Sequence, residues 1–372
     1  MLALDDDDQF LDIEIYQPPL AQTASLGLKQ SCVRWLPSAH PVSGGALALA
    51  GSWDEPSNEL SVWSVLLGND EDDVMDDGSG GAAQKGGAAQ NIGSCMHQGD
   101  VLGLSVGTAS AGRLVAYTAS GAGGACCYAV DIGANGDAAI APQWADGNRS
   151  CAPAGGLATL GVCYSEEAGL GVASVGEDGV LSLLSPERGQ CGWRAQSSEP
   201  ALFDVCWWDR NTCVTAGTAL AMWDVRSKAS APSLVLSPSP GAEAHLAAQL
   251  LCIGADPNPH SRLAAGASDG VVHLCDVRSA GNGSAPMRSV AAHAADVWGI
   301  QFGSGQQYGQ VLSCASDGLL RAWPIAAGQE LVDSRPLVDH AFPINSLHLS
   351  PEGWLASASD AQVLTFLDLR QM

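Results

Sequence analysis

The chain has 372 residues, enough for one large domain, and combines 46% hydrophobic with only 15% charged residues. Its net charge of −24 argues against binding to a nucleic-acid backbone, which depends on lysine and arginine. No run of about 18 apolar residues is present, and the start Met-Leu-Ala-Leu-Asp lacks the basic and apolar regions of a signal peptide. Neither a membrane span nor a secretion signal is therefore predicted.

In chain order, residues 1–9 form an acidic tail that we expect to be disordered. Phe10–Tyr16 alternates apolar and polar residues and predicts a strand, as do Leu28–Trp35 and the hairpin within residues 46–65. Residues 68–91 are acidic and then glycine-rich, without apolar periodicity. This segment predicts a disordered insertion within one domain spanning residues 10–372.

A repeated turn divides the rest of the chain. Each copy has small residues, then a turn aspartate, then an alternating strand, and the aspartates are Asp178, Asp269, Asp317 and Asp360. They are 91, 48 and 43 residues apart, that is about two periods and then one period each. Repeats of about 40–45 residues with a Trp-Asp ending are typical of WD-repeat blades with four strands. The sequence therefore predicts an all-β fold, a WD-repeat β-propeller.

The hairpins in chain order give seven blades. A second pattern supports this number, because His97, His293 and His340 each stand shortly before an alternating strand. The chain ends just after the third strand of the seventh blade. We therefore expect the N-terminal strand, near residues 10–16, to complete that blade and close the ring.

Polar residues in the repeats suggest buried hydrogen-bond networks. In the sixth blade, His293, Asp317 and Trp323 can be joined through Ser313 or Ser316. Other blades keep only parts of this set, so we interpret their residues as structural and not catalytic: Asp178, Asp269, Asp360 and Trp223.

Signatures of catalysis and metal binding are missing from the sequence. The 12 cysteines include no Cys-x-x-Cys pair, and several lie in predicted strands, which favours free buried thiols. There is no Gly-x-Ser-x-Gly, no phosphate-binding loop and no His-Glu-x-x-His. We therefore predict no catalytic residues, no metal, no cofactor and no enzyme activity.

Five residues at blade entrances are candidates for binding a protein partner. Leu102, Phe203 and Trp298 each follow the first apolar residue of an inner strand, and Trp53 and Asp54 lie in the first hairpin turn. All five should lie on one face of the ring, near the central channel. Aromatic residues on such a rim are typical partner anchors, although burial between blades is an equal alternative for Trp53 and Trp298.

Trp223, Asp224 and Arg226 form a Trp-Asp-x-Arg box. The box resembles the one found in WD-repeat substrate receptors of cullin-4 ubiquitin ligases, which gives an alternative function. An arginine after this strand also serves loop packing in many propellers, and we favour that explanation.

Four motifs together resemble the forty-three-kilodalton WD-repeat nucleoporin family of the nuclear pore Y-complex: Gly51–Ser64, Val175–Gly179, Met222–Arg226 and Ala292–Trp298. The resemblance implies a scaffold subunit of the outer ring of the nuclear pore complex, at the nuclear envelope, which supports mRNA and protein transport. It further implies a monomeric propeller within a large assembly. The implied partners are other Y-complex nucleoporins, notably the eighty-five-kilodalton α-solenoid subunit of the short arm, with no direct nucleic-acid contact and no membrane insertion.

Overall fold

The computed structural model describes ten ranges of the chain: residues 21–37, 45–66, 89–109, 112–145, 157–227, 231–238, 248–257, 261–279, 287–326 and 330–371. The predicted tail at residues 1–9 and the predicted strand at residues 10–16 lie outside them. So do residues 68–88 of the predicted insertion, whereas residues 89–91 begin a strand.

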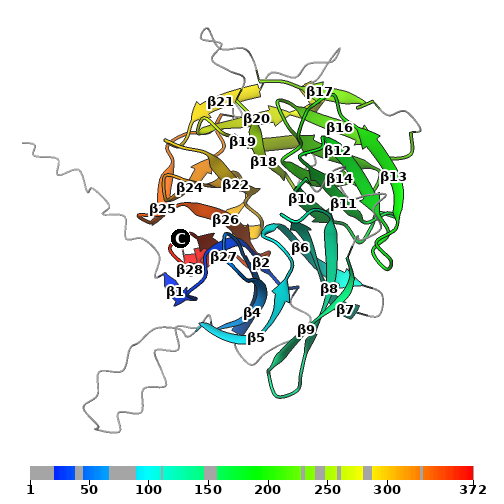
Figure 1. The fold of residues 1–372 in the computed structure, drawn as a ribbon. Helices are drawn as coiled ribbons and strands as arrows, with labels where there is room; N and C mark the ends of the chain where they lie inside the picture. The colour runs from blue at the N-terminus through cyan, green and yellow to red at the C-terminus, as the bar shows by residue number, and fades with distance from the viewer. Residues whose placement is uncertain are drawn as a thin grey trace, which may run out of the picture.

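The fold is a ring of seven four-stranded antiparallel sheets, the blades of a β-propeller (Figure 1). Blade 1 consists of β2 (Gln30–Trp35), β3 (Gly45–Ser52), β4 (Asn58–Leu66) and β5 (Ala89–His97). Blade 2 consists of β6 (Val101–Ala109), β7 (Arg113–Ser120), β8 (Ala125–Ile132) and β9 (Ala138–Ala145). Blade 3 consists of β10 (Thr159–Tyr164), β11 (Val172–Gly176), β12 (Val180–Leu184) and β13 (Cys191–Gln196). Blade 4 consists of β14 (Asp204–Asp209), β15 (Thr212–Ala216), β16 (Leu220–Asp224) and β17 (Leu234–Leu236).

The remaining three blades complete the circle. Blade 5 consists of β18 (Leu250–Ala255), β19 (Arg262–Ala267), β20 (Val271–Asp276) and β21 (Met287–Ala291). Blade 6 consists of β22 (Val297–Phe302), β23 (Gln310–Ala315), β24 (Leu319–Pro324) and β25 (Arg335–Asp339). Blade 7 consists of β26 (Ile344–Leu349), β27 (Trp354–Ser359), β28 (Val363–Asp368) and β1 (Gln22–Ser25). The described ranges also contain the short 3₁₀ helices η2 (Val277–Ser279), η4 (Gly305–Gln307) and η5 (Leu369–Gln371). The predicted all-β, seven-bladed WD-type propeller is thus confirmed.

An N-terminal strand closes the ring, as predicted, but at a different place. Strand β1 pairs antiparallel with β28, with Ala24 opposite Leu364, and Figure 1 shows it beside the C-terminal end of the chain. The closing strand is Gln22–Ser25, so the expected position near residues 10–16 was wrong. Gln22–Ser25 is hard to recognise in the sequence because it carries a single buried side chain, Ala24, and shows little alternation. A strand that contributes only one small apolar residue leaves a weak signal.

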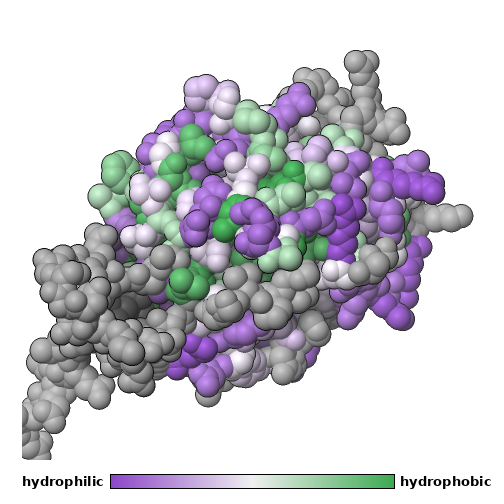
Figure 2. Space-filling model, turned by 90° about the horizontal axis from the view of Figure 1, so that it is seen from below, coloured by the Kyte–Doolittle hydropathy of each residue, from purple (hydrophilic) through white to green (hydrophobic). Residues whose placement is uncertain are grey.

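The core is divided into layers between neighbouring blades. Leu49, Leu60 and Val62 of blade 1, for example, pack with Val101 and Leu104 of blade 2. The first strands of neighbouring blades also contact one another around the whole ring. Seen edge-on in Figure 2, hydrophobic residues are scattered among hydrophilic ones on the outer surface, which fits burial of the apolar faces between the blades.

Small residues at the end of each second strand let the blades approach closely. A Cβ on Gly51 would lie 2.5 Å from Cγ1 of Val101, and a Cβ on Gly266 would lie 2.4 Å from Cγ1 of Val297. Both glycines therefore meet the first residue of the next blade's inner strand. The small residues that precede the repeated turn in the sequence serve this packing.

Candidate functional site

One face of the ring collects the sequence-predicted residues. Since consecutive strands of a blade are antiparallel, the segment that enters the innermost strand and the turn between the second and third strands lie at the same end of the blade. We call this end of the ring the entry face and the opposite end the exit face. The repeated turns with Asp269 and Asp317, and the entry segments with His293 and His340, all belong to the entry face.

A β-bulge at the start of the inner strand shapes the channel mouth on this face. At the start of the inner strand, the register between first and second strands shifts in six blades, and the shift passes over one residue each time: Ser31, Leu102, Leu160, Leu251, Trp298 and Asn345. In blade 4, Phe203 takes the same place immediately before β14. Bulges re-aim side chains, and all seven residues line one hollow of about 180 Å³.

The structure brings together three of the predicted rim residues, Leu102, Phe203 and Trp298, in the wall of this hollow. Trp298 is 41% exposed, and its Nε1–H donates to Oγ of Ser316 at 2.7 Å. Sequence reasoning missed Leu160 and Leu251, although each also follows the first residues of an inner strand and could have been aligned.

Phe342 is an exposed aromatic residue that the sequence analysis overlooked. It is 55% exposed and lies in the segment that enters blade 7. A Cβ on Gly318 would lie 3.2 Å from the carbonyl oxygen of Phe342. Phe342 and Trp298 therefore flank the same turn, Ser316–Gly318.

Trp53 joins blade 1 to blade 7. Its Nε1–H donates to Oδ1 of Asp360 at 3.0 Å, and Nδ2 of Asn345 donates to the same oxygen at 2.7 Å. Trp53 is half-buried, whereas Asp54 is exposed and pairs with Lys29. Asp360 thus supports the junction between blades 7 and 1. Within blade 7, Nε2 of His340 lies 3.1 Å from Oγ1 of Thr365.

The entry face is strongly acidic. Its described connections carry ten carboxylates against one lysine, Lys29. The carboxylates are Asp54, Glu55, Asp100, Glu177, Asp178, Glu199, Asp269, Asp296, Asp317 and Asp360. Burial lowers the pKa of His97, His293 and His340 below the usual value, so these histidines add no positive charge at neutral pH.

The exit face is less one-sided in charge than the entry face, because five arginines lie among the acidic residues of its described connections. These are Arg188, Arg210, Arg226, Arg278 and Arg370.

The predicted network of blade 6 is complete. Nδ1 of His293 lies 3.1 Å from the carboxylate of Asp317, and Nε2 lies 2.8 Å from Oγ of Ser313. Nε1–H of Trp323 donates to the same Oγ at 2.9 Å, so Ser313 and not Ser316 is the joining residue. The network links two strands, β23 and β24, with the turn between them and the entry segment of the same blade.

The other residues interpreted as structural make local contacts. Oδ1 of Asp178 accepts from N–H of Val180 at 3.1 Å, and Oδ1 of Asp269 accepts from N–H of Val271 at 3.2 Å. Trp223 is 1% exposed, and its Nε1–H donates to Oγ1 of Thr215 at 3.0 Å.

This chain is similar to two known nucleoporins. It is 26% identical to nucleoporin Nup43 of Homo sapiens over 315 residues, which cover 79% of this chain and 73% of the relative. The chain resembles nucleoporin Nup43. Nucleoporin Nup43 of Mus musculus is 27% identical over the same length and coverage, and no family model matches. The resemblance predicted from the four sequence motifs is confirmed.

The Trp-Asp-x-Arg box has a local structural role. The guanidinium of Arg226 makes two bonds to Asp224, at 3.0 and 2.8 Å, and holds the pKa of that carboxyl at about 2. The same pairing joins Asp276 to Arg278 and Asp368 to Arg370. Because three blades repeat this geometry and Trp223 is buried, the box is explained by loop packing, and the ligase alternative is not favoured.

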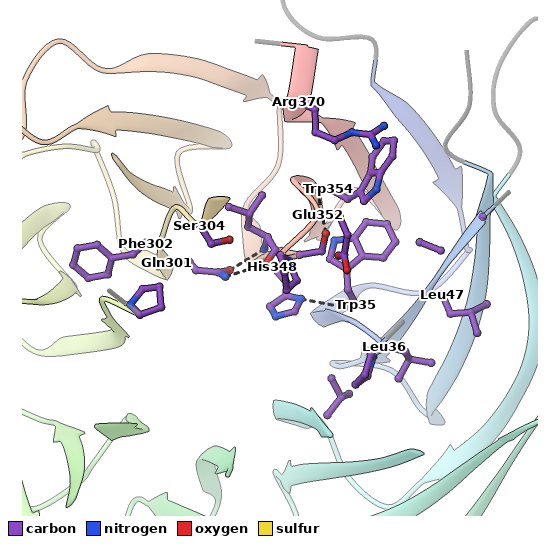
Figure 3. Close-up of a pocket in the computed structure, with 18 of the residues that line it drawn as sticks. Trp35, Leu36, Leu47, Gln301, Phe302, Ser304, His348, Glu352, Trp354 and Arg370 are labelled. Atoms are coloured by element: carbon purple, nitrogen blue, oxygen red, sulfur yellow. Dashed lines mark hydrogen bonds between the residues drawn. The ribbon is translucent and has the colours of Figure 1, made fainter. Parts of the chain in front are cut away.

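A larger cavity of about 990 Å³ lies at the exit end of the channel (Figure 3). Trp35, Phe302, His348 and Trp354 line it, and the Arg370 guanidinium carbon stacks 3.8 Å from the centre of the Trp354 ring. Nδ1 of His348 accepts from the backbone N–H of Trp35 at 2.9 Å. Burial lowers the pKa of His348 to about 3, so its ring is neutral at physiological pH.

Within the described ranges, no group of three or more His, Cys, Asp or Glu side chains is placed to hold a metal ion. The same ranges contain no helix with the length and apolarity that crossing a membrane requires.

Proposed function

We propose that this chain is a non-enzymatic scaffold subunit of the nuclear pore complex, located at the nuclear envelope. The observation that carries the proposal is the resemblance to nucleoporin Nup43 over 79% of the chain. The seven-bladed ring supports it, since propellers of this kind present rigid faces to other proteins. The finer part of the proposal is a place in the Y-complex of the outer ring, where the chain supports pore assembly and the transport of mRNA and protein.

The proposed partner is the eighty-five-kilodalton α-solenoid nucleoporin of the short arm, and the proposed contact surface is the entry face. Its rim residues are Trp53, Asp54, Leu102, Phe203 and Trp298. An exposed aromatic such as Trp298 beside a hollow suits the centre of a protein interface, where large side chains supply most of the binding energy.

The test is affinity purification of the tagged chain from cells, followed by mass spectrometry, with imaging of its position at the nuclear rim. We expect outer-ring nucleoporins in the purified material. A preparation without them, together with diffuse fluorescence, would overturn the proposed function.

A matched pair of variants tests the proposed surface separately. Trp298 on the entry face and Tyr308 on the exit face are both exposed aromatics, at 41% and 51%. Trp298→Ala should reduce recovery of the α-solenoid subunit about tenfold, and Tyr308→Ala should leave it unchanged. Equal recovery with both variants would exclude the channel mouth as the contact.

A further inference from the structure

The entry face has two properties that together define what can bind there. A hollow whose wall carries large apolar side chains beside polar groups opens at its centre, and carboxylates lie on the surrounding connections. We propose that the channel mouth binds an extended basic segment of a partner protein, which inserts one leucine- or phenylalanine-sized side chain among Leu102, Phe203 and Trp298. Lysine or arginine residues on either side of this anchor then pair with the surrounding carboxylates. The inference rests on the proposed function in that the propeller acts as a protein-interaction module through this face.

The size of the hollow fits a single large apolar side chain. Its volume is about 180 Å³, and a protein cavity of about 150 Å³ already accepts a benzene ring. Leu102, Leu160, Phe203, Leu251 and Trp298 supply apolar wall on five successive blades. Transfer of an aromatic or aliphatic side chain from water into such a wall is favourable.

Among the described residues that line the hollow, Arg34 is the one cation, and its charge disfavours a second cation inside. NH1 of Arg34 donates to Oγ of Ser346 at 2.9 Å and to the carbonyl oxygen of Val33 at 2.7 Å. Asp204, also in the wall, accepts backbone N–H groups from Val205 and Ile253. Since these polar groups are already hydrogen-bonded, the hollow favours an apolar anchor, and the cations of the segment remain outside on the rim.

The rim supplies the opposite charge. Asp296 lies two residues before Trp298, and Asp54, Asp100 and Asp269 lie on turns of other blades around the same face. Lys29 is the only cation in the described connections of this face, and Asp54 already pairs with it. The negative electrostatic potential of these carboxylates attracts lysine and arginine and speeds the association of a basic segment. The same potential repels nucleic-acid phosphates and anionic lipid. A basic protein segment is therefore the occupant that both properties favour.

The proposal can be tested with the purified full chain and labelled peptides, by fluorescence anisotropy. The probe is Gly-Arg-Lys-Phe-Lys-Arg-Gly. One comparison peptide has serine in place of phenylalanine, and the other has glutamate in place of each basic residue. We expect the probe to bind, each comparison peptide to bind about tenfold or more weakly, and affinity to fall as salt rises from about 50 to about 200 mM.

Variants locate the binding. Trp298→Ala should weaken the probe about tenfold and Asp296→Asn about threefold. The matched exit-face variants Tyr308→Ala and Glu166→Gln, which replace an exposed aromatic and an exposed carboxylate, should bind it as the unmodified chain does. Absence of binding up to about 1 mM probe, equal binding of the acidic peptide, or insensitivity to Trp298→Ala would each overturn the inference.

The outcome remains separable from the proposed function. If the probe fails to bind while Trp298→Ala still releases the nucleoporins, the proposed segment chemistry is wrong and the scaffold role stands. If the probe binds at the mouth but no nucleoporin co-purifies, the scaffold role fails and the basic-segment site stands.

Discussion

Ring closure by β1 can be broken with one substitution that leaves the rest of the chain unchanged. The backbone N–H of Leu26 donates to the carbonyl oxygen of Gln362 at 2.9 Å, which makes these two residues a hydrogen-bonded pair. Antiparallel pairs alternate between hydrogen-bonded and non-hydrogen-bonded types. By this alternation Ala24 and Leu364 are hydrogen-bonded, whereas the register partners Thr23 and Thr365 are not. A proline at Ala24 therefore removes a ladder bond, and a proline at Thr23 does not.

The expected loss follows from these contacts. Ala24→Pro removes one backbone hydrogen bond and leaves the carbonyl oxygen of the buried Leu364 without its donor. These effects together should lower the free energy of unfolding by about 2–3 kcal/mol. An unfolding entropy of about 2.1 cal/mol/K per residue converts this loss to about 3 °C in Tm for a chain of this length.

The assay is urea unfolding followed by tryptophan fluorescence, together with thermal melting, on both proline variants. The exposed Thr23→Pro variant controls for proline itself and should stay within about 0.5 kcal/mol of the unmodified chain. A chain that begins at residue 19 keeps β1 and should also melt normally. If Ala24→Pro is as stable as Thr23→Pro, the pairing of β1 with β28 does not hold the ring closed, and the reasoning is refuted.

Three further predictions concern stability. Burial lowers the pKa of His293 in the folded chain, so the unfolded chain binds a proton at this ring more readily. The stability that the neutral ring contributes is therefore complete above about pH 6.5. It is lost as the pH falls below that value, by at most about 1.4 kcal/mol per pH unit. Urea unfolding at two pH values measures this loss, and His293→Gln should reduce it. An unchanged loss would show that His293 is not the titrating group. Trp223→Phe removes the hydrogen bond to Thr215 and should lower the free energy of unfolding by about 1–2 kcal/mol, measured in urea; a double-mutant cycle with Thr215→Val that gives no coupling energy would contradict this prediction. In thermal melts, Gly318→Ala should cost more than about 2 kcal/mol of stability, because the added Cβ would lie 1.9 Å from a carbonyl oxygen. Gly112 has a similar φ but lies in open space, so Gly112→Ala should cost about 1 kcal/mol. Equal losses in the two variants would show that the close contact at Gly318 relaxes.

The sequence by itself determined the blades. Alternation and a recurring turn aspartate, 48 and 43 residues apart in the last three copies, are local signals, and each copy carries them within a single hairpin. The network of His293, Asp317 and Trp323 could be predicted for the same reason, since its members hold fixed positions in one repeat. The alignment of Leu102, Phe203 and Trp298 also followed from position within the repeat, and these residues do lie together at the channel mouth.

Only the tertiary structure decided how the repeats meet. The partner of β1 lies at the other end of the chain, and no local pattern in Gln22–Ser25 reveals which strand it joins. The contact of Asp360 with Trp53 also crosses from the last blade to the first. The bulges that turn one residue per blade into the channel appear only when the paired strand is known. The gathering of carboxylates on one face likewise depends on which turns share an end of the ring, because the antiparallel arrangement of the strands, and not distance along the chain, sets their position in space.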